Sequence, residues 1–308
     1  MHEKILVKSP ASIANLGPGF DILAIAIEGP HDKVLVEPLE EPRIVVDADG
    51  APPGRDNAAY AVAEHMLRRH CPACGVRIRV WKGVPISAGL GSSGATSAAV
   101  AYALNELFGL NLASKDLLEA AAEGEYLVAG ARHYDNIAAS LLGGLVVIGR
   151  HAGLGVLRLE PLSVWFGIIV MRSEEEGKTG LARSLLPQHL RLEDHVRQAS
   201  AMASLLASVH MNDPVLFGRA ISVDYVAEPV RKAMIPHYDE LKGVAFKEGA
   251  LGFNISGAGP SVFIVHNDRD EAERIAAELI QRLSSNGVDA ESLVAGPSAE
   301  GVVTLDSD

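Results

Sequence analysis

Apolar and polar residues alternate through much of the first fifty positions, and this period of two predicts β-strands with one buried face. Gly and Pro interrupt the alternation, which covers Ile5 to Val7, Ile22 to Ile27, Val34 to Val36 and Ile44 to Val46. Apolar residues at helical spacing predict helices at 57–69, 92–108 and 115–129, with strands at 76–81 and 144–148. The first half is therefore predicted to form a mostly antiparallel sheet with Ala-rich helices.

The pattern changes after a stretch rich in Gly and Pro, residues 151–162, in which a short strand at 156–159 also fits. There follow a strand at 166–171, helices up to about Glu248, two strands around a turn at 257–260, a helix at 271–283 and a strand at 290–295. This β-α-β-β-α-β order, with extra helices, indicates the α+β class. Because single cores rarely grow past roughly 250 residues and the chain has 308, we expect two domains, 1–162 and 163–308.

Composition argues against several classes of function. Apolar residues make up 48% of the chain and charged residues 21%, which is typical of a globular protein with a substantial core. The net charge of -12 disfavours nucleic acid as a partner, because such binding depends on Lys and Arg that neutralise phosphates. There is no signal-peptide core and no apolar run near the roughly 20 residues of a membrane span. We therefore expect a cytoplasmic protein that binds neither nucleic acid nor membranes.

The two cysteines, Cys71 and Cys74, form a single C-x-x-C motif. A zinc site would need further Cys or His ligands at the usual spacing, and redox chemistry would need a thioredoxin-like context. Neither surrounds this motif, so the expected structure is a turn that carries two ordinary thiols.

A segment rich in Gly and Ser leads directly into the helix predicted at 92–108. It consists of Pro85, Ile86, Ser87, Ala88, Gly89, Leu90, Gly91, Ser92, Ser93, Gly94 and Ala95. Glycines let the backbone approach an anion closely, a helix N-terminus offers unpaired N–H groups, and hydroxyls reach oxygen or Mg²⁺. The segment lacks the Lys of a Walker A loop and does not fit a Rossmann turn. It is expected to bind phosphate; the alternative is a Ser-capped helix after a flexible turn.

Three motifs resemble those of the GHMP kinases, the superfamily of galactokinase and of the homoserine, mevalonate and phosphomevalonate kinases. Segment 85–95 resembles the central nucleotide motif, 9–21 (SPASIANLGPGFD) the N-terminal motif in its homoserine kinase form, and 255–261 (ISGAGPS) the C-terminal glycine motif. Gly94 departs from the pattern, because the family usually has Ala there. The resemblance implies an N-terminal domain like ribosomal protein S5 domain 2, a ferredoxin-like C-terminal domain, and ATP in the cleft between them.

The resemblance also bears on nucleotide and metal. Asn57 is expected to cap a helix, near the position of the family's adenine pocket. Mg²⁺ prefers oxygen ligands and usually takes one or two protein groups besides substrate phosphates. Ser93 and Glu125 match the family's metal-binding positions. The alternative is a solvated acidic helix face, with Glu123 as the residue most easily mistaken for the ligand.

The acceptor substrate is implied by His133-Tyr134-Asp135-Asn136, which resembles the homoserine kinase form of a segment that carries the catalytic Asp in mevalonate and galactose kinases. Without that context, the four residues could form only a polar turn. The implied activity is transfer of the γ-phosphoryl group of ATP to the side-chain hydroxyl of L-homoserine, in threonine biosynthesis. Such transfer depends chiefly on positioning. We expect Asn136 to orient the hydroxyl, and Asp135 to fix that geometry or accept its proton.

An amino acid substrate needs partners for its ammonium and its carboxylate. By resemblance, the residues around homoserine are Asn15, Asp21, His133, Asn136 and Gly257. Asp21 is the natural partner of the ammonium group. Arg183 and Arg231 match the family's two carboxylate-binding arginines.

Several alternatives stay open. Mevalonate-type and shikimate-type kinases are the nearest, but their substrates lack the ammonium group for which Asp21 and segment 133–136 argue. A lyase similar to mevalonate diphosphate decarboxylase is another. A nucleotide-binding regulator without catalysis is the alternative from a different class, and Ser93, Glu125 and the two arginines argue against it. Because members of the family are commonly dimers, the resemblance also implies a homodimer.

Overall fold

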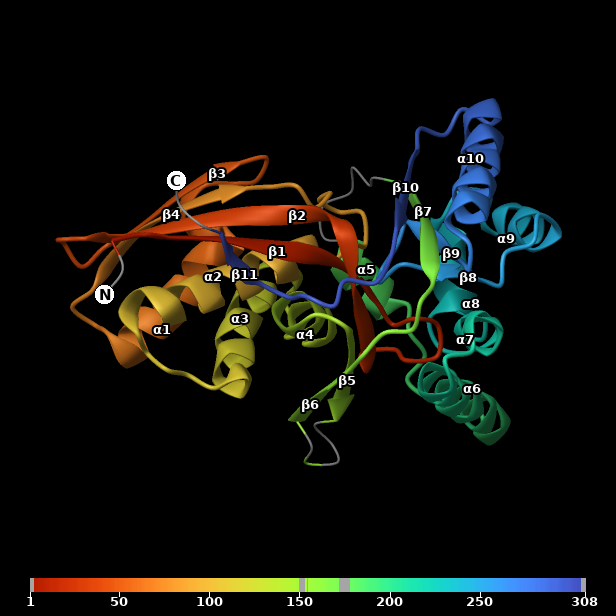
Figure 1. Ribbon diagram of the computed structural model, residues 1–308, viewed down its shortest axis with the longest axis horizontal. Coiled ribbons are helices and arrows are strands. Elements are labelled where there is room, and N and C mark those ends of the chain that lie inside the picture. The colour runs from red at the N-terminus through yellow and green to blue at the C-terminus, as the bar shows by residue number, and fades with distance from the viewer. Residues whose placement is uncertain (1–2, 150–152, 154, 172–177, 306–308) are drawn as a thin grey trace.

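The computed structural model describes residues 3–149, 153, 155–171 and 178–305. Figure 1 shows two groups of elements side by side along the long axis of the molecule. One group has long strands that run above a layer of helices, and the other has a smaller sheet with its own helices (Figure 1). Each group is built on one β-sheet.

Within the described residues, the first sheet has seven strands. They are β1 (Ile5–Ala14), β2 (Leu23–Leu39), β3 (Ile44–Asp49), β4 (Gly75–Trp81), β5 (Leu145–Gly149), β6 (Gly155–Leu159) and β11 (Val303–Leu305). Their order is β11-β1-β2-β4-β3, with β5 on β2 and β6 on β5, and all pairs except β3 with β4 are antiparallel. The predicted antiparallel sheet is therefore confirmed.

Strand β2 differs from the prediction, which placed two separate strands at 22–27 and 34–36. Its second half pairs with β4 over residues 33–39, and its first half pairs with β5 over residues 23–25. The polar residues between the two apolar runs stay extended because β1 pairs with them, with Ser9 opposite Asp32 and Pro10 opposite His31. One continuous strand therefore connects both ends of the sheet.

Four helices lie on one face of this sheet (Figure 1): α1 (Ala58–His70), α2 (Ser92–Phe108), α3 (Ser114–Ala129) and α4 (Asp135–Leu142). The first three confirm the predicted helices. The prediction missed α4, because its eight residues are too few for a clear helical period and begin inside a polar segment. Fully buried side chains, such as Val34, Ile78, Val62 and Leu104, form the core between sheet and helices.

Within the described residues, the second sheet has four strands, β7 (Trp165–Val170), β8 (Gly252–Ile255), β9 (Val262–His266) and β10 (Glu291–Ala295), in the antiparallel order β10-β7-β9-β8. The helices of this half are α5 (Lys178–Ser184), α6 (Leu192–Met211), α7 (Pro214–Ile221), α8 (Glu228–Arg231), α9 (Tyr238–Lys247) and α10 (Arg269–Ser285). This arrangement confirms the predicted β-α-β-β-α-β order. Among the helices described, none combines the length and apolar character needed to cross a membrane.

A buried apolar cluster joins the two halves. It contains Ile13 from β1 together with Phe166 from β7 and Phe217 from α7. Strand β11 also returns from the second half and pairs with β1, with Leu6 opposite Leu305. We still propose the division at 1–162 and 163–308, with β11 as a final strand that completes the first sheet.

The C-x-x-C motif corrects one expectation. The turn is confirmed, because the N–H of Cys74 donates a hydrogen bond of 2.9 Å to the carbonyl of Cys71 at the end of α1. The two free thiols are not, since Cys71 and Cys74 form a disulfide bond. The same turn that ends the helix brings the two sulfur atoms together.

Candidate active site

A cavity of about 240 Å³ opens where the two halves of the chain meet. Its walls come from the loop at 85–91, the first turn of α2, the last turns of α3, the start of α4, and α5. Asn15 and Asp21 of the N-terminal motif and Gly257 of the C-terminal motif also line it. The three sequence motifs, which lie far apart along the chain, therefore meet at one cavity. The predicted site residues line it, with the exception of Ala88, Leu90, Gly94 and Ala95.

The loop at 85–91 is held in left-handed backbone conformations that glycine adopts readily. Gly89 has a φ of 77°, and Gly91, which precedes α2, has a φ of 70°. A Cβ on Gly89 would lie 2.3 Å from the carbonyl oxygen of Ser256, and the Ser256 hydroxyl donates a hydrogen bond of 2.8 Å to the carbonyl of Gly89. The C-terminal glycine motif therefore contacts this loop directly and supports its shape.

The four predicted residues that do not line the cavity have supporting positions. Ala88, Leu90 and Ala95 are fully buried in the cluster that joins the two halves. Gly94 lies where α2 meets α4, and a Cβ there would lie 3.1 Å from the Cβ of Asn136. Glycine at this position therefore lets the two helices approach closely.

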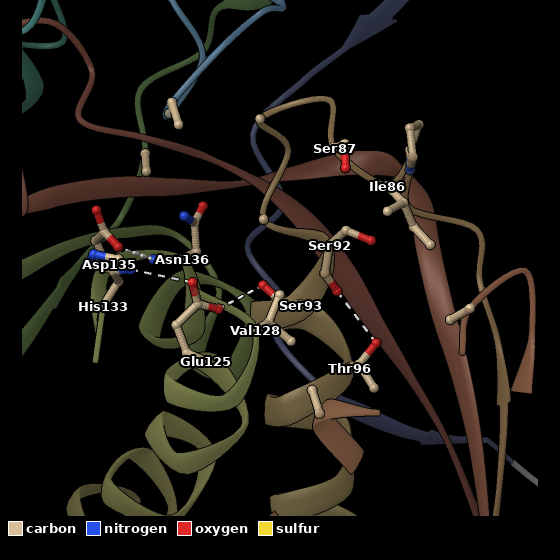
Figure 2. Close-up of a pocket in the computed structure, with 18 of the residues that line it drawn as sticks. Ile86, Ser87, Ser92, Ser93, Thr96, Glu125, Val128, His133, Asp135 and Asn136 are labelled. Carbon is tan, nitrogen blue, oxygen red and sulfur yellow. Dashed lines mark hydrogen bonds and ion pairs between the residues drawn. The ribbon is translucent and has the colours of Figure 1, made fainter. Parts of the chain in front are cut away.

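Asn57 caps α1, as predicted. Its side-chain oxygen accepts a hydrogen bond of 2.9 Å from the N–H of Ala59, and its amide group donates one of 2.7 Å to the carbonyl of Pro52. Asn57 also lines the cavity. The exposed apolar side chains of Ile86 and Val128 line it as well (Figure 2). The two expectations for Asn57, a cap and a pocket residue, are therefore compatible.

Ser93 and Glu125 face each other between α2 and α3 (Figure 2). The hydroxyl of Ser93 donates a hydrogen bond of 2.6 Å to Oε2 of the buried Glu125. Glu123 instead points away and pairs with Arg132, with 3.0 Å between Nη2 and Oε1. Among the described residues, no group of three His, Cys, Asp or Glu side chains could hold a metal alone. Ser93 and Glu125 provide hard oxygen ligands that fit Mg²⁺, whose shell is usually completed by phosphate and water.

The start of α4 brings Asp135 and Asn136 to the cavity (Figure 2). Asp135 is buried, and this burial, together with the nearby Asp21, raises the pKa of its carboxyl to about 6. Its Oδ1 accepts a hydrogen bond of 2.8 Å from the N–H of Asn136. The Oδ1 of Asn136 accepts one of 2.9 Å from the hydroxyl of Ser12. Segment 133–136 therefore begins a helix instead of forming an isolated polar turn.

His133 connects two charged groups of the cavity wall. Its Nδ1 lies 3.3 Å from Oε1 of Glu125, and its Nε2 lies 2.8 Å from Nη1 of Arg183. Arg183 in turn binds Asp21 through two contacts, at 2.7 Å and 3.3 Å. The chain of contacts therefore runs from α3 through His133 to α5 and to the segment that follows β1.

Arg231 lies deeper in the same wall. It is buried, and it donates hydrogen bonds to the carbonyls of Gly257 at 3.0 Å and Ala182 at 3.3 Å. Burial lowers its pKa from the ordinary arginine value. The amide of Asn15 donates to the same Gly257 carbonyl at 3.0 Å. The ring of Phe20 lies 5.2 Å from the Arg231 guanidinium, a cation–π distance.

Comparison with known proteins identifies the family. Residues 57–144 match the GHMP kinases N terminal domain, and residues 201–285 match the GHMP kinases C terminal domain. A homoserine kinase of Thermoplasma volcanium is 37% identical over 286 residues, which cover 92% of each chain. The chain belongs to the GHMP kinase family. A homoserine kinase of Methanopyrus kandleri is 38% identical over 286 residues, with 92% of this GHMP kinase and 94% of that protein covered.

Solved structures agree with this assignment. The crystal structure of homoserine kinase from Cytophaga hutchinsonii superposes with a TM-score of 0.90 and 32% identity, and covers 99% of this GHMP kinase and 98% of that chain. Mevalonate kinase of L. major has a TM-score of 0.72 at 17% identity, with 97% and 98% of the two chains covered, and shares the fold. The α+β two-domain fold implied by the motifs is therefore confirmed.

Sequence reasoning missed a buried polar cluster beneath the first turn of α2. In this GHMP kinase, Lys82 forms an ion pair with Asp32 and donates hydrogen bonds to the carbonyl of Ser92 at 2.8 Å and the hydroxyl of Thr96 at 2.9 Å. The other oxygen of Asp32 accepts from the two backbone N–H groups that follow Lys82, each at 3.1 Å. Burial lowers the pKa of Lys82, and Asp32 opposes that shift. The cluster fixes both the entry to the loop and the start of α2.

The signal for this cluster lies in strand pairing. Strands β2 and β4 are antiparallel, with Lys33 opposite Trp81. Continuing that register by one position sets Asp32 opposite Lys82. No sequence period reveals this pairing, because Asp32 lies inside one strand and Lys82 follows the end of another.

Proposed function

We propose that this GHMP kinase is a phosphotransferase with an alcohol group as acceptor, which transfers the γ-phosphoryl group of ATP to the side-chain hydroxyl of L-homoserine. The products are O-phospho-L-homoserine and ADP, and the reaction belongs to threonine biosynthesis. The naming of relatives at 37% and 38% identity as homoserine kinases supports this acceptor. The closeness of the Cytophaga hutchinsonii structure supports it as well.

The observation that carries the proposal is the charge pattern of one wall of the cavity. Asp21, Arg183 and Arg231 line the same cavity as Asn136 and the loop at 85–91. An acidic side chain suits an ammonium group, and arginines suit a carboxylate. Mevalonate and shikimate carry no ammonium group, so acceptors of those types offer no cation to Asp21.

The opposite part of the cavity suits the nucleotide. The N-terminus of α2 offers backbone N–H groups and a positive dipole end to phosphates, and the loop before it leaves space for a polyphosphate. The apolar side chains of Ile86 and Val128 and the side chain of Asn57 suit the adenine. Ser93 and Glu125 would hold Mg²⁺, which neutralises phosphate charge when bound.

The chemistry requires little from the protein beyond alignment. We propose that the amide of Asn136, whose oxygen is held by Ser12, orients the acceptor hydroxyl in line with the γ-phosphorus. The hydroxyl oxygen forms the new bond to phosphorus while the bond to the ADP oxygen breaks. The buried carboxylate of Asp135 accepts the hydroxyl proton, and its raised pKa of about 6 suits proton transfer near neutral pH.

Two further proposals rest on this function. ATP and free amino acids are abundant in the cytoplasm, so we propose that the protein acts there. We also propose a homodimer. Leu192, Val196 and Met211 of α6 leave apolar side chains exposed, as an interface between two copies would require. Sedimentation of the purified protein tests the dimer.

An ADP-release assay with Mg-ATP tests the proposed function. The acceptors are L-homoserine, mevalonate, shikimate and galactose, with a blank that contains no acceptor. We expect turnover with L-homoserine alone and a product with the mass of O-phosphohomoserine. Turnover with another acceptor would refute the substrate, whereas ATP binding without any turnover would favour a nucleotide-binding regulator.

A further inference from the structure

Asp21 and Arg183 bind each other across the substrate half of the cavity. Nη2 of Arg183 lies 2.7 Å from Oδ2 of Asp21, and Nη1 lies 3.3 Å from Oδ1, so the two planar groups meet side by side. Asp21 belongs to the segment between β1 and β2, and Arg183 belongs to α5, so the pair joins the two halves of the chain. Its two side chains are 36% and 42% exposed, which leaves them accessible to a small solute.

The neighbours of this pair hold it in register. Nη1 of Arg183 also donates to Nε2 of His133 at 2.8 Å, and the Arg183 guanidinium lies 5.7 Å from the ring of Phe20. On the other side, the N–H of Asp21 donates to Oδ1 of Asn15 at 3.2 Å. Asp21 has a φ of 56°, a conformation that a non-glycine residue rarely adopts without support. The contact is therefore a built part of the cavity wall.

The pair has a direct consequence for binding. The proposed function assigns Asp21 to the ammonium group of the substrate and Arg183 to its carboxylate. In the structure, Asp21 and Arg183 bind each other instead. Arg231 differs, because it is buried and donates its hydrogen bonds to the backbone carbonyls of Gly257 and Ala182.

We propose that the Asp21–Arg183 ion pair is a zwitterion filter, which the substrate opens by exchanging partners. The ammonium group takes Asp21 and the carboxylate takes Arg183, so one ion pair is replaced by two. This inference rests on the proposed function and explains how the cavity would distinguish an α-amino acid from an analogue that carries only one of its two charges. Arg231, which is outside the pair, attracts the carboxylate but does not open the pair.

The filter selects because a ligand with one charge cannot complete the exchange. A hydroxy acid takes Arg183 and leaves Asp21 without a partner, and an amino alcohol does the reverse. A bound analogue covers part of the pair, so the charged group left without a partner loses its ion pair and some of its water together. The ion pair itself therefore competes with each singly charged analogue.

The test uses two analogues and two variants of the full-length protein. γ-Hydroxybutyrate is homoserine without its ammonium group, and propanolamine is homoserine without its carboxylate. Dissociation constants of L-homoserine and both analogues are measured by calorimetry for the wild type, Asp21→Asn and Arg183→Gln. ATP affinity confirms that each variant is folded. Asp239→Asn, which removes the exposed Lys232–Asp239 pair, is the matched control.

We expect the variants to gain affinity for one analogue each. Asp21→Asn should bind L-homoserine at least about tenfold more weakly than the wild type. It should bind γ-hydroxybutyrate roughly two- to fivefold more tightly, because Arg183 is released from a partly exposed ion pair. Arg183→Gln should likewise bind L-homoserine more weakly, and propanolamine more tightly, than the wild type does. A purely structural pair would give losses only, so unchanged or weaker analogue binding in both variants would overturn the filter. Failure of the proposed function is a separate result, since it appears as absent turnover of L-homoserine by the wild type.

Discussion

Ser12 donates a hydrogen bond of 2.9 Å to Oδ1 of Asn136, although the two residues are 124 positions apart. Ser12 belongs to β1 and Asn136 to the first turn of α4. Because the amide oxygen is occupied by this hydroxyl, the amide nitrogen remains for the cavity. The N-terminal motif and the acceptor segment therefore position one another.

Gly91 makes this contact possible, and its replacement gives the first prediction. A Cβ on Gly91 would lie 2.3 Å from Oγ of Ser12 and 2.7 Å from Oδ1 of Asn136. We expect Gly91→Ala to lower kcat/KM for the acceptor by roughly 100-fold, because small misplacements of positioning groups have effects of that size. Steady-state kinetics with L-homoserine measures it.

Gly109 provides the matched control. It ends α2 with a φ of 58°, and a Cβ there would meet nothing within 4 Å. Gly109→Ala should therefore destabilise the protein by about 1 kcal/mol through backbone strain while kcat/KM stays at the wild-type value. Equal losses of activity in both variants would mean that strain, and not the Ser12–Asn136 contact, explains the effect.

The second prediction concerns the metal. Glu125→Gln weakens the oxygen ligand that faces Ser93, and we expect it to raise the Mg²⁺ concentration needed for half-maximal activity at least 10- to 100-fold. Glu123→Gln, two positions away and paired with Arg132, should leave the Mg²⁺ dependence unchanged. Titration of Mg²⁺ at constant ATP measures both. A larger effect in Glu123→Gln would reverse the assignment.

The third prediction concerns the buried cluster beneath α2. Asp32→Asn leaves Lys82 buried without its carboxylate partner, so we expect a loss of roughly 3–5 kcal/mol in the free energy of unfolding. Glu41→Gln removes an exposed pair with Arg43 of 3.3 Å and should change that free energy by less than about 0.5 kcal/mol. Urea unfolding compares the two. Similar values for both variants would show that the Asp32–Lys82 pair adds nothing beyond a surface contact.

Long elements with a clear hydrophobic period are predicted well from the sequence. Short elements, and those that depend on pairing with a distant strand, are predicted poorly. The helix at 92–108 agrees with α2 in both bounds, because a Gly and Ser segment precedes it and Gly109 ends it. Helix α4 and strand β11 were missed, since eight and three residues carry little periodic signal. The existence of β11 depends on its pairing with β1, which is tertiary information.

The same distinction holds for the cavity. Motifs with distinctive local chemistry, such as the loop at 85–91, indicated their residues in advance, and the family resemblance indicated Arg183 and Arg231. Asp32 and Lys82 have no local motif, because their contact arises from the register of two strands. The ion pair between Asp21 and Arg183 is not predicted from the sequence either. The family resemblance assigns each of the two residues to a charged group of the substrate, but it does not indicate that they contact each other.

The last prediction follows from Asp135. Burial raises the pKa of its carboxyl from 3.8 to about 6, so the folded protein binds this proton more tightly than the unfolded chain does. The contribution of Asp135 to stability is therefore most favourable below about pH 4 and falls as the pH rises to about 6. Asp135→Asn keeps an acceptor for the N–H of Asn136 but carries no charge. We expect this variant to be roughly 2–3 kcal/mol more stable than the wild type at pH 8 and to show no such gain at pH 4.

Activity should change in the opposite direction. If the ionised Asp135 accepts the hydroxyl proton, kcat/KM of the wild type rises with pH and levels off above about 6. Asp135→Asn should lower kcat by roughly 100-fold or more and remove that rise. Both profiles are measured at saturating Mg-ATP, so that titration of the nucleotide affects the two proteins equally. A variant that kept wild-type kcat would contradict Asp135 as the proton acceptor. A variant that lost stability at pH 8 would contradict the unfavourable burial of its charge. A variant that is more stable but inactive would show that the buried charge of Asp135 lowers stability and is required for catalysis.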